Sequence, residues 1–287
     1  MAEIGPRMPW GVWVRVHAKA ILQALPLALL IVVEGRDLYY RATWQVRPVP
    51  PSDFRTGDVV LLCNRWYALP SWGQRVYSLI AKGLLKSAWE EVGFIIVREN
   101  HEPHLVYCDP DGVREEPLGA FLRCRQPRGA ALRALRVEDG RPPPSLDIAD
   151  IFMQEVRKNP PQPWYLFAAS MRHGAEHQYY EFCVRMNKEY RKMRAMVRRA
   201  QTRQAIHDQI EQLREMETMR EYLATRVERK PEFHLFNGSL VASFLATYGY
   251  LDRVLPSPSR YVPQDFAHDL PFTGSTSLGE PVVFFKT

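Results

Sequence analysis

Two groups of side chains have the types that nucleophilic catalysis uses. Cys108 follows His101 and His104 by a few residues, and Ser239 follows His234 at a similar separation. An imidazole beside a thiol or hydroxyl can take its proton and so activate it to attack an acyl group. The members of each pair stand on predicted strand or turn, and short separation along the chain does not by itself bring them together. The simpler interpretation is a buried thiol and surface imidazoles.

The four cysteines follow neither a metal-site nor a disulfide pattern. Cys63, Cys108, Cys124 and Cys183 stand far apart, without a CxxC pair and without a histidine at ligand spacing. Disulfide frameworks and zinc sites need such regular spacings. We therefore expect reduced thiols, no metal site and no cofactor.

Composition indicates a globular protein with one locally basic face. The chain has 287 residues, of which 46% are apolar, and a net charge of +6. This is enough for one sizeable core, or for a moderate domain with an appendage, and fits neither disorder nor a fibrous repeat. From Arg185 to Arg203, eight Arg or Lys residues stand against one acid, Glu189.

Hydrophobic patterning predicts an α+β domain. Short apolar runs bounded by turn residues indicate strands, and apolar residues at helical spacing indicate helices. The expected elements are a strand at Val59–Leu62, a helix at Tyr77–Lys86, a hairpin of Val92–Val97 with Leu105–Tyr107, a short helix from Pro117 to Leu122, a strand at Ala131–Val137 and a late helix at Leu240–Tyr248. A strand, a helix and then antiparallel strands belong to the α+β class.

Several short motifs support a more specific assignment when taken together. They are Arg55–Leu62, Ser87–Val97, Gly112-Val113 with Pro117-Leu118 and Phe121-Leu122, and, late in the chain, Phe236–Val241 and Tyr261–Phe266. This combination resembles the permuted papain-like, NlpC-type cysteine hydrolases over residues 52–137 and 231–285. The resemblance implies an antiparallel sheet with packed helices.

The resemblance also implies where a catalytic pair would stand. The family typically has a His just before the Val-Gly of the central strand and a Cys that opens the later helix; here these positions hold Glu91 and Asn237. An amide is no thiolate nucleophile, and a carboxylate opposite it forms a hydrogen bond instead. A third, orienting position would lie near Tyr107 or Cys108. We expect a degenerate, non-catalytic site in which Asn237 caps the helix.

The first part of the chain has the character of a membrane-associating segment. Trp10–Val33 is mostly apolar, and Ala20–Val33 is interrupted only by Gln23 and Pro26. A span needs about 20 residues, so it must include Arg15 and Lys19 and the intervening His, which could snorkel to one interface. We predict that residues 10–33 span or lie in the interface; the alternative is a buried core helix.

Flanking residues refine this prediction. Aromatic residues typical of membrane boundaries stand on both sides of the run, namely Trp10, Trp13, Tyr39, Tyr40 and Trp44. Arg7, Arg15 and Lys19 against the single acid Glu3 are typical of a mitochondrial entry sequence. We expect the mitochondrial inner membrane as the location.

An insert of predicted helical character separates the two matching parts. Glu176–Glu228 contains neither Pro nor Gly, which predicts one long helix or a helical hairpin. Two apolar stripes run along it out of phase: Met186, Tyr190, Met193, Val197 and Ala200, and then Ile206, Ile210 and Leu213. The surrounding basic residues could meet RNA phosphates, anionic lipids or acidic protein, or remain solvated. Scarce aromatic residues argue against sequence-specific RNA recognition.

These observations divide the chain into four parts: residues 1–47 (membrane-associating), 48–140 and 231–287 (papain-like) and 141–230 (helical arm). The combination predicts a non-catalytic accessory subunit of a large membrane complex such as the respiratory chain or ATP synthase. Its expected partners are other subunits, and lipids through residues 10–33; nucleic acid is not expected. Two alternatives stay open: a cysteine hydrolase or acyltransferase with a relocated nucleophile, and a mitochondrial ribosomal accessory protein.

Overall fold

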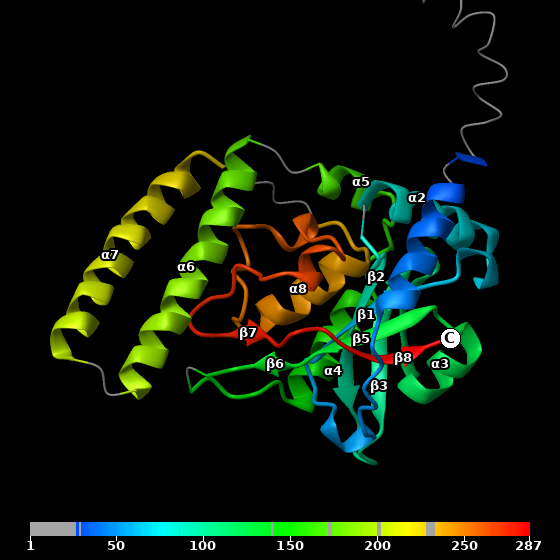
Figure 1. The fold of residues 1–287 in the computed structure, drawn as a ribbon, viewed down its shortest axis with the longest axis horizontal. Coiled ribbons are helices and arrows are strands. Elements are labelled where there is room, and N and C mark those ends of the chain that lie inside the picture. Colours follow the sequence, from blue (N-terminus) through cyan, green and yellow to red (C-terminus); the bar gives the residue numbers. More distant parts are fainter. Residues whose placement is uncertain are drawn as a thin grey trace, which may run out of the picture.

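The computed structural model describes residues 27–28, 30–85, 87–138, 140–171, 174–199, 202–227 and 233–287. At its centre lies a six-stranded sheet in which every neighbouring pair is antiparallel (Figure 1). The strands lie in the order β4 (Gly112–Pro117), β3 (Pro103–Asp109), β2 (Glu91–Val97), β1 (Val59–Cys63), β5 (Gly129–Arg133) and β8 (Val282–Lys286). The predicted mixed α+β class with an antiparallel sheet is confirmed.

Helices cover both faces of this sheet. α4 (Leu146–Val156) and α8 (Asn237–Thr247) pack on one face, and α3 (Leu118–Arg125) packs on the other. The remaining helices are α2 (Trp72–Leu85), α5 (Tyr165–Ser170), α6 (Gly174–Arg198) and α7 (Arg203–Thr225). Helical backbone also runs through residues 30–43, which we call the N-terminal helix. Short 3-10 turns include η2 (Trp66–Ala68) and η4 (Asp265–Ala267).

Both faces of the central strands are apolar because each face packs on helices. Side chains alternate along a strand, so Val59 and Leu61 join the core formed with α8, while Val60 and Leu62 join the core beneath α3. On the α8 side, the rings of Phe94 and Phe244 stack with centroids 3.9 Å apart. Strands buried on both faces appear in the sequence as continuous apolar runs.

The strand predicted at Ala131–Val137 is interrupted. β5 ends at Arg133, and the amide of Leu135 donates to the Asp58 carboxylate (2.8 Å) instead of continuing the ladder. Leu135 then starts the two-residue β6 (Leu135–Arg136), which pairs with β7 (Ser277–Leu278). One carboxylate therefore splits the segment between two sheets.

The segment predicted as an arm, residues 141–230, only partly extends from the domain. Its first helix, α4, belongs to the core, where the Phe152 ring lies 5.5 Å from that of Phe244. The later part forms the α6–α7 hairpin at one side of the molecule (Figure 1), so of the two alternatives the hairpin is confirmed. On its predicted stripe, Met186 is buried and Val197 is exposed; Ala200 lies outside the described residues.

The predicted membrane segment, Trp10–Val33, falls mainly outside the described residues. Residues 27–28 of it are helical, and residues 30–33 are the first residues of the N-terminal helix. Among the helices that the structure describes, none combines the length and the apolar character required to cross a bilayer.

Trp44 fastens the end of the N-terminal helix to the sheet. Its ring stacks on Trp89 with centroids 4.7 Å apart and covers the backbone of Gly129 on β5. A Cβ at Gly129 would lie 2.3 Å from a Trp44 ring carbon. Only glycine leaves room for this ring.

The Gly129→Ala substitution should therefore displace Trp44. We expect a loss of about 1–3 kcal/mol in the free energy of unfolding, because overpacking forces the ring or the strand to move. Urea unfolding measures it. Gly73→Ala is the matched control, since its Cβ would meet nothing closer than 3.9 Å. Equal stabilities of the two variants would contradict the assigned role of Gly129.

Candidate functional site

The two positions singled out by the sequence lie beside each other where β2 meets α8. Glu91 is the first residue of β2, and Asn237 is the first residue of α8. The buried Asn237 side chain donates from Nδ2 to the main-chain oxygen of Glu90 (3.1 Å). An amide-to-carbonyl hydrogen bond thus ties the helix to the strand.

The predicted cap is displaced by one residue. Phe236 occupies the N-cap position of α8, and its side chain has no acceptor atom. Ser239 Oγ instead accepts the Phe236 amide (2.8 Å), while Asn237 Oδ1 accepts the Gly238 amide (2.7 Å). The prediction that Asn237 is the N-cap is wrong. Two side chains inside the first turn, Ser239 and Asn237, accept the hydrogen bonds of the Phe236 and Gly238 amides.

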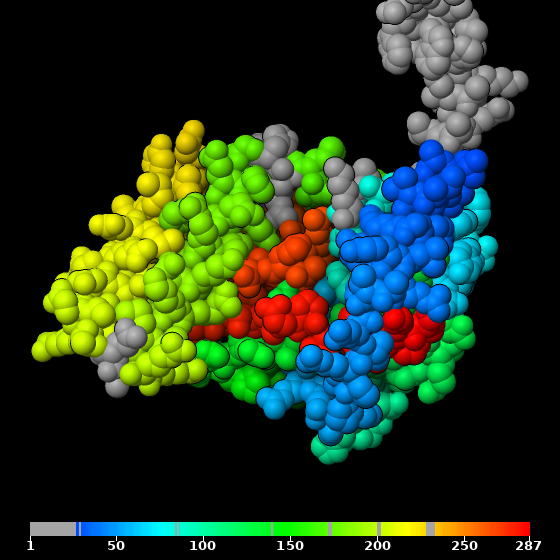
Figure 2. Space-filling model, in the orientation of Figure 1, coloured from blue at the N-terminus to red at the C-terminus, as the bar shows by residue number. Residues whose placement is uncertain are grey.

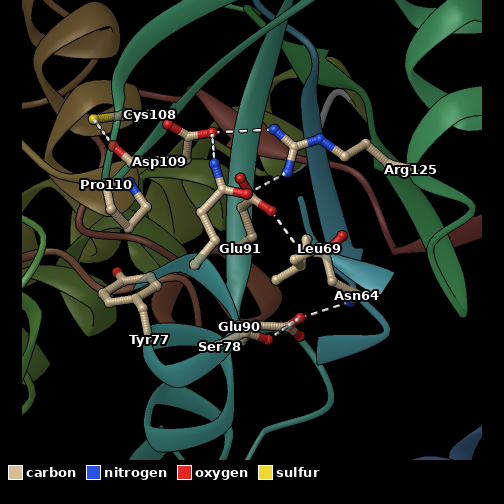
Figure 3. A pocket seen from close by; sticks show the side chains of 11 residues that line it. Asn64, Leu69, Tyr77, Ser78, Glu90, Glu91, Cys108, Asp109, Pro110 and Arg125 are labelled. Atoms are coloured by element: carbon tan, nitrogen blue, oxygen red, sulfur yellow. Dashed lines mark hydrogen bonds and ion pairs between the residues drawn. The ribbon is translucent and has the colours of Figure 1, made fainter. Parts of the chain in front are cut away.

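A small cavity lies against Glu91 (Figure 3). Its volume is about 20 Å³, which holds roughly one water molecule. Its lining comes from the end of β1 and the turn after it, from α2, and from β2, β3 and α3: Asn64, Leu69, Gln74, Tyr77, Ser78, Glu90, Glu91, Cys108, Asp109, Pro110 and Arg125.

Glu91 is held by a neighbouring amide. Its Oε2 accepts a hydrogen bond from Asn64 Nδ2 at 2.5 Å (Figure 3). Burial raises the pKa of Glu91 to about 7, against the lowering effects of Arg125 and of the Asn64 hydrogen bond. The carboxyl group is therefore neutral in a substantial fraction of molecules at neutral pH.

Beside Glu91, three side chains satisfy one another. Arg125 donates to Asp109 and to Gln74 Oε1 (both 3.1 Å), and Gln74 Nε2 donates to Asp109 Oδ2 (2.8 Å). Both Gln74 and Asp109 are buried. Buried polar groups that are mutually satisfied rigidify a site.

Behind the cavity lies a buried ammonium. Lys82 of α2 has no exposed side-chain surface; its Nζ donates to the Asn64 carbonyl (2.6 Å) and to the carboxylate of Asp37, and lies 3.7 Å from Glu90 Oε1. Burial disfavours the charged Lys82, but Glu90, Cys63 and Asp37 outweigh it and raise its pKa overall. Burial raises the pKa of Glu90 to about 8 despite Lys82. This cluster joins the N-terminal helix, α2 and two strands.

The Cys108 pairs proposed from the sequence do not assemble. Cys108 lies opposite Val113 on β4, whereas His104 lies at the other end of β3, with Nδ1 3.4 Å from Glu115. Four strand residues span about 13 Å. His101 lies in the turn before β3. Burial raises the pKa of the Cys108 thiol, and the nearby acids Asp109 and Glu91 raise it further.

The second pair is also separated. Ser239 is fully buried; its Oγ donates to the Phe236 carbonyl (3.0 Å) as well as accepting the Phe236 amide. The His234 ring stacks on Tyr165 and its Nδ1 lies 2.5 Å from Gln162 Oε1. The Ser239 hydroxyl thus uses both its donor and an acceptor site at the start of α8.

Four residues that shape this region were missed from the sequence. They are Asn64, just after β1, Gln74 and Lys82 of α2, and Arg125 of α3. One signal could have revealed Lys82, since it interrupts the apolar Leu79–Leu85 stretch. The other three follow no local pattern. In the described part of the chain, no group of three His, Cys, Asp or Glu side chains is placed to hold a metal ion.

Comparison with protein-family models, with curated proteins and with solved structures finds no match in any of the three. The resemblance to the NlpC-type family stays a prediction based on motifs. Geometry alone describes the region as a polar joint in which Asn64, Ser78 of α2 and Asn237 of α8 hold Glu90 and Glu91.

The raised pKa of Glu91 predicts a pH-dependent stability. Its folded pKa of about 7 lies above the ordinary 4.5, so its stabilising contribution is complete below pH 4.5 and is lost as the pH rises through 7. Between pH 5 and pH 8 the free energy of unfolding should fall in both proteins. We expect the fall to be about 1–3 kcal/mol smaller in Glu91→Gln than in the wild type. Urea unfolding at both pH values measures this difference.

The exposed Glu155 of α4 offers the control. Glu155→Gln should leave the pH dependence as in the wild type. A Glu91→Gln protein with the wild-type slope would show that this carboxyl group does not titrate in the folded state as assigned.

Proposed function

We propose that this chain is a non-catalytic accessory subunit of a large membrane complex of the mitochondrial inner membrane, built on a degenerate papain-like fold. The observation that carries the non-catalytic part is the Asn237 amide. It opens the helix at the position where the resembling family places its thiol, and it donates to the main-chain oxygen of Glu90. An amide so placed ties two elements together and cannot be acylated as a thiolate can.

Three requirements of acyl transfer point the same way. The reaction needs a thiolate or activated hydroxyl, a base within hydrogen-bond reach, and room for the acyl group. The position of the base is Glu91, which Asn64 engages, and the space beside it holds about one water molecule. Restoring a hydrolase would require changes in all three.

The connection between domain and N-terminus supports a structural role. Asp37 of the N-terminal helix pairs with the buried Lys82, and Glu34 pairs with Arg128 beside β5. Breaking a buried pair by removing one partner costs about 3–5 kcal/mol. The helix that follows the apolar Ala20–Val33 run is therefore held rigidly on the domain.

Charge pairing weakens the ribosomal alternative. Of the basic residues on α6, Lys188 and Arg191 face Asp269 (3.0 and 3.4 Å), and Arg198 faces Glu138 (3.3 Å). Cations that neutralise acids of their own chain contribute less to phosphate binding. The described surface of α6 thus favours contact within the protein over RNA.

Replacing Cys108 separates this proposal from the hydrolase alternative. In cells that carry only the variant, Cys108→Ala should support growth and complex assembly like the wild type, because the thiol performs no chemistry. Assembly is measured on native gels of detergent-solubilised membranes. Loss of function with a normally folded, fully assembled Cys108→Ala chain would favour the relocated nucleophile.

Membrane attachment is testable on the full chain. Under alkaline carbonate extraction we expect the wild type to stay in the membrane pellet and a chain lacking residues 1–26 to move to the supernatant. Native purification should recover a constant set of membrane subunits. Release of the wild type together with ribosomal proteins would overturn the proposal.

A further inference from the structure

Two carboxyl groups from different parts of the chain face the buried Lys82. Asp37, on the N-terminal helix, accepts a hydrogen bond from Lys82 Nζ, and Glu90 Oε1, on the domain, lies 3.7 Å from the same nitrogen. All three side chains are buried. A buried ammonium that loses its carboxylate is strongly destabilising. Which of the two carboxyl groups carries the compensating charge therefore decides how firmly the helix is attached.

The surroundings of Glu90 favour its neutral form while the helix is attached. Its Oε1 accepts from the Asn64 amide (2.6 Å) and the Ser78 hydroxyl (3.3 Å), as Figure 3 shows. Its buried Oε2 has no hydrogen-bond partner among the described residues, so this oxygen is free to carry the proton of a neutral carboxyl group. Burial raises the pKa of Glu90 to about 8; Lys82 opposes the rise and the charge of Asp37 adds to it.

The one-water cavity gives the proton of Glu90 a way out. Glu90 lines this cavity together with Glu91, whose side chain is only partly buried. One water molecule in a space of this size reaches both carboxyl groups. Glu90 can therefore exchange its proton with solvent without unfolding of the domain.

The other ionisable groups around this pair come from every element that packs on it: Tyr77 of α2, Cys63 of β1, Glu91 of β2, and Glu34, Arg36 and Arg128 on the Asp37 side. Burial raises the pKa of both Tyr77 and Cys63, so both stay neutral up to pH 8. Glu91 titrates in the same range, but its hydrogen bond comes from Asn64. Glu90 is thus the titrating group that lies beside the ammonium.

Ionisation of Glu90 changes what Lys82 requires. While Glu90 is neutral, Asp37 supplies the charge that the ammonium needs, and the helix that carries Asp37 must stay. Once Glu90 is ionised, the same ammonium has a carboxylate within the domain. The N-terminal helix, blue in Figure 2, lies on the outside of the molecule, so it can move away without opening the sheet.

We propose that Lys82 exchanges Asp37 for Glu90 when Glu90 loses its proton, and that this exchange releases the N-terminal helix from the domain. The chain after the helix stays attached, because Trp44 stacks on Trp89 and the Arg47 amide donates to the Val283 carbonyl (2.8 Å). The helix therefore pivots at Trp44. Such a device would make the direction of everything that precedes residue 30 depend on pH.

Hydrogen exchange of the purified full chain tests this proposal. The attached form binds the Glu90 proton and the released form does not, so the released fraction should grow by up to about tenfold per pH unit between 4.5 and about 8. We compare protection factors, which are corrected for the intrinsic exchange rate, at pH 5.5 and pH 8. Those of the helical amides at residues 34–43 should fall at least about tenfold more than those of β1, which report global unfolding.

Three variants assign the effect. Glu90→Gln keeps the shape of the side chain but cannot ionise, so the helix should then change with pH no more than β1 does. Asp37→Asn removes the partner on the helix and should lower the protection of the helix already at pH 5.5. The exposed Glu155→Gln is the matched control and should keep the pH dependence of the wild type.

Two outcomes would overturn the exchange of partners. One is a wild type in which helix and β1 amides change in parallel, and this result needs no variant to fold. The other is a Glu90→Gln protein with native near-ultraviolet circular dichroism that keeps the wild-type fall in helix protection. Carbonate extraction and native purification test the proposed function separately, since they can fail without altering either result.

Discussion

Lys82 carries a positive charge in the middle of the protein without any exposed side-chain surface. Removing an ammonium from water costs several kcal/mol, which only closely placed acceptors offset. Two acceptors come from distant segments, Asp37 of the N-terminal helix and the Asn64 carbonyl after β1, and a third segment brings Glu90 Oε1 to 3.7 Å from the ammonium. These segments must therefore meet around one side chain, and much of the remaining geometry follows from that requirement.

The candidate site is built from the same groups. The Asn64 carbonyl accepts a hydrogen bond from Lys82. Its main-chain amide donates to Glu90 and its side-chain Nδ2 donates to Glu91 (Figure 3). Asn237 then takes the main-chain oxygen of Glu90 and brings α8 onto the sheet. Each of these contacts joins two elements around the cavity. The polar residues hold elements together, and the one-water cavity is what remains between them.

The requirement to compensate Lys82 also explains the N-terminal helix. Its acids Glu34 and Asp37 meet Arg128 and Lys82, and Val33 is buried on the same side, whereas Ile31 and Tyr39 are exposed. Trp44 adds a second attachment by stacking on Trp89 above Gly129. Contacts with the domain thus fix the position and orientation of this helix. The residues that make no contact with the domain form its outward face.

Local sequence patterns determined the elements. Apolar runs and turn residues located β1, the β2–β3 hairpin, α3 and α8, because strand and helix periodicity and turn chemistry act over a few residues. The family resemblance, and not periodicity, placed Glu91 just before the predicted strand at Val92 and Asn237 at the opening of the later helix. The tertiary structure alone decided the pairing of β8 with β5, the entry of α4 into the core and the break at Leu135, which the Asp58 carboxylate causes. It alone brought Asp37 to Lys82 and kept His104 away from Cys108, since burial and charge compensation depend on residues that are distant in the sequence.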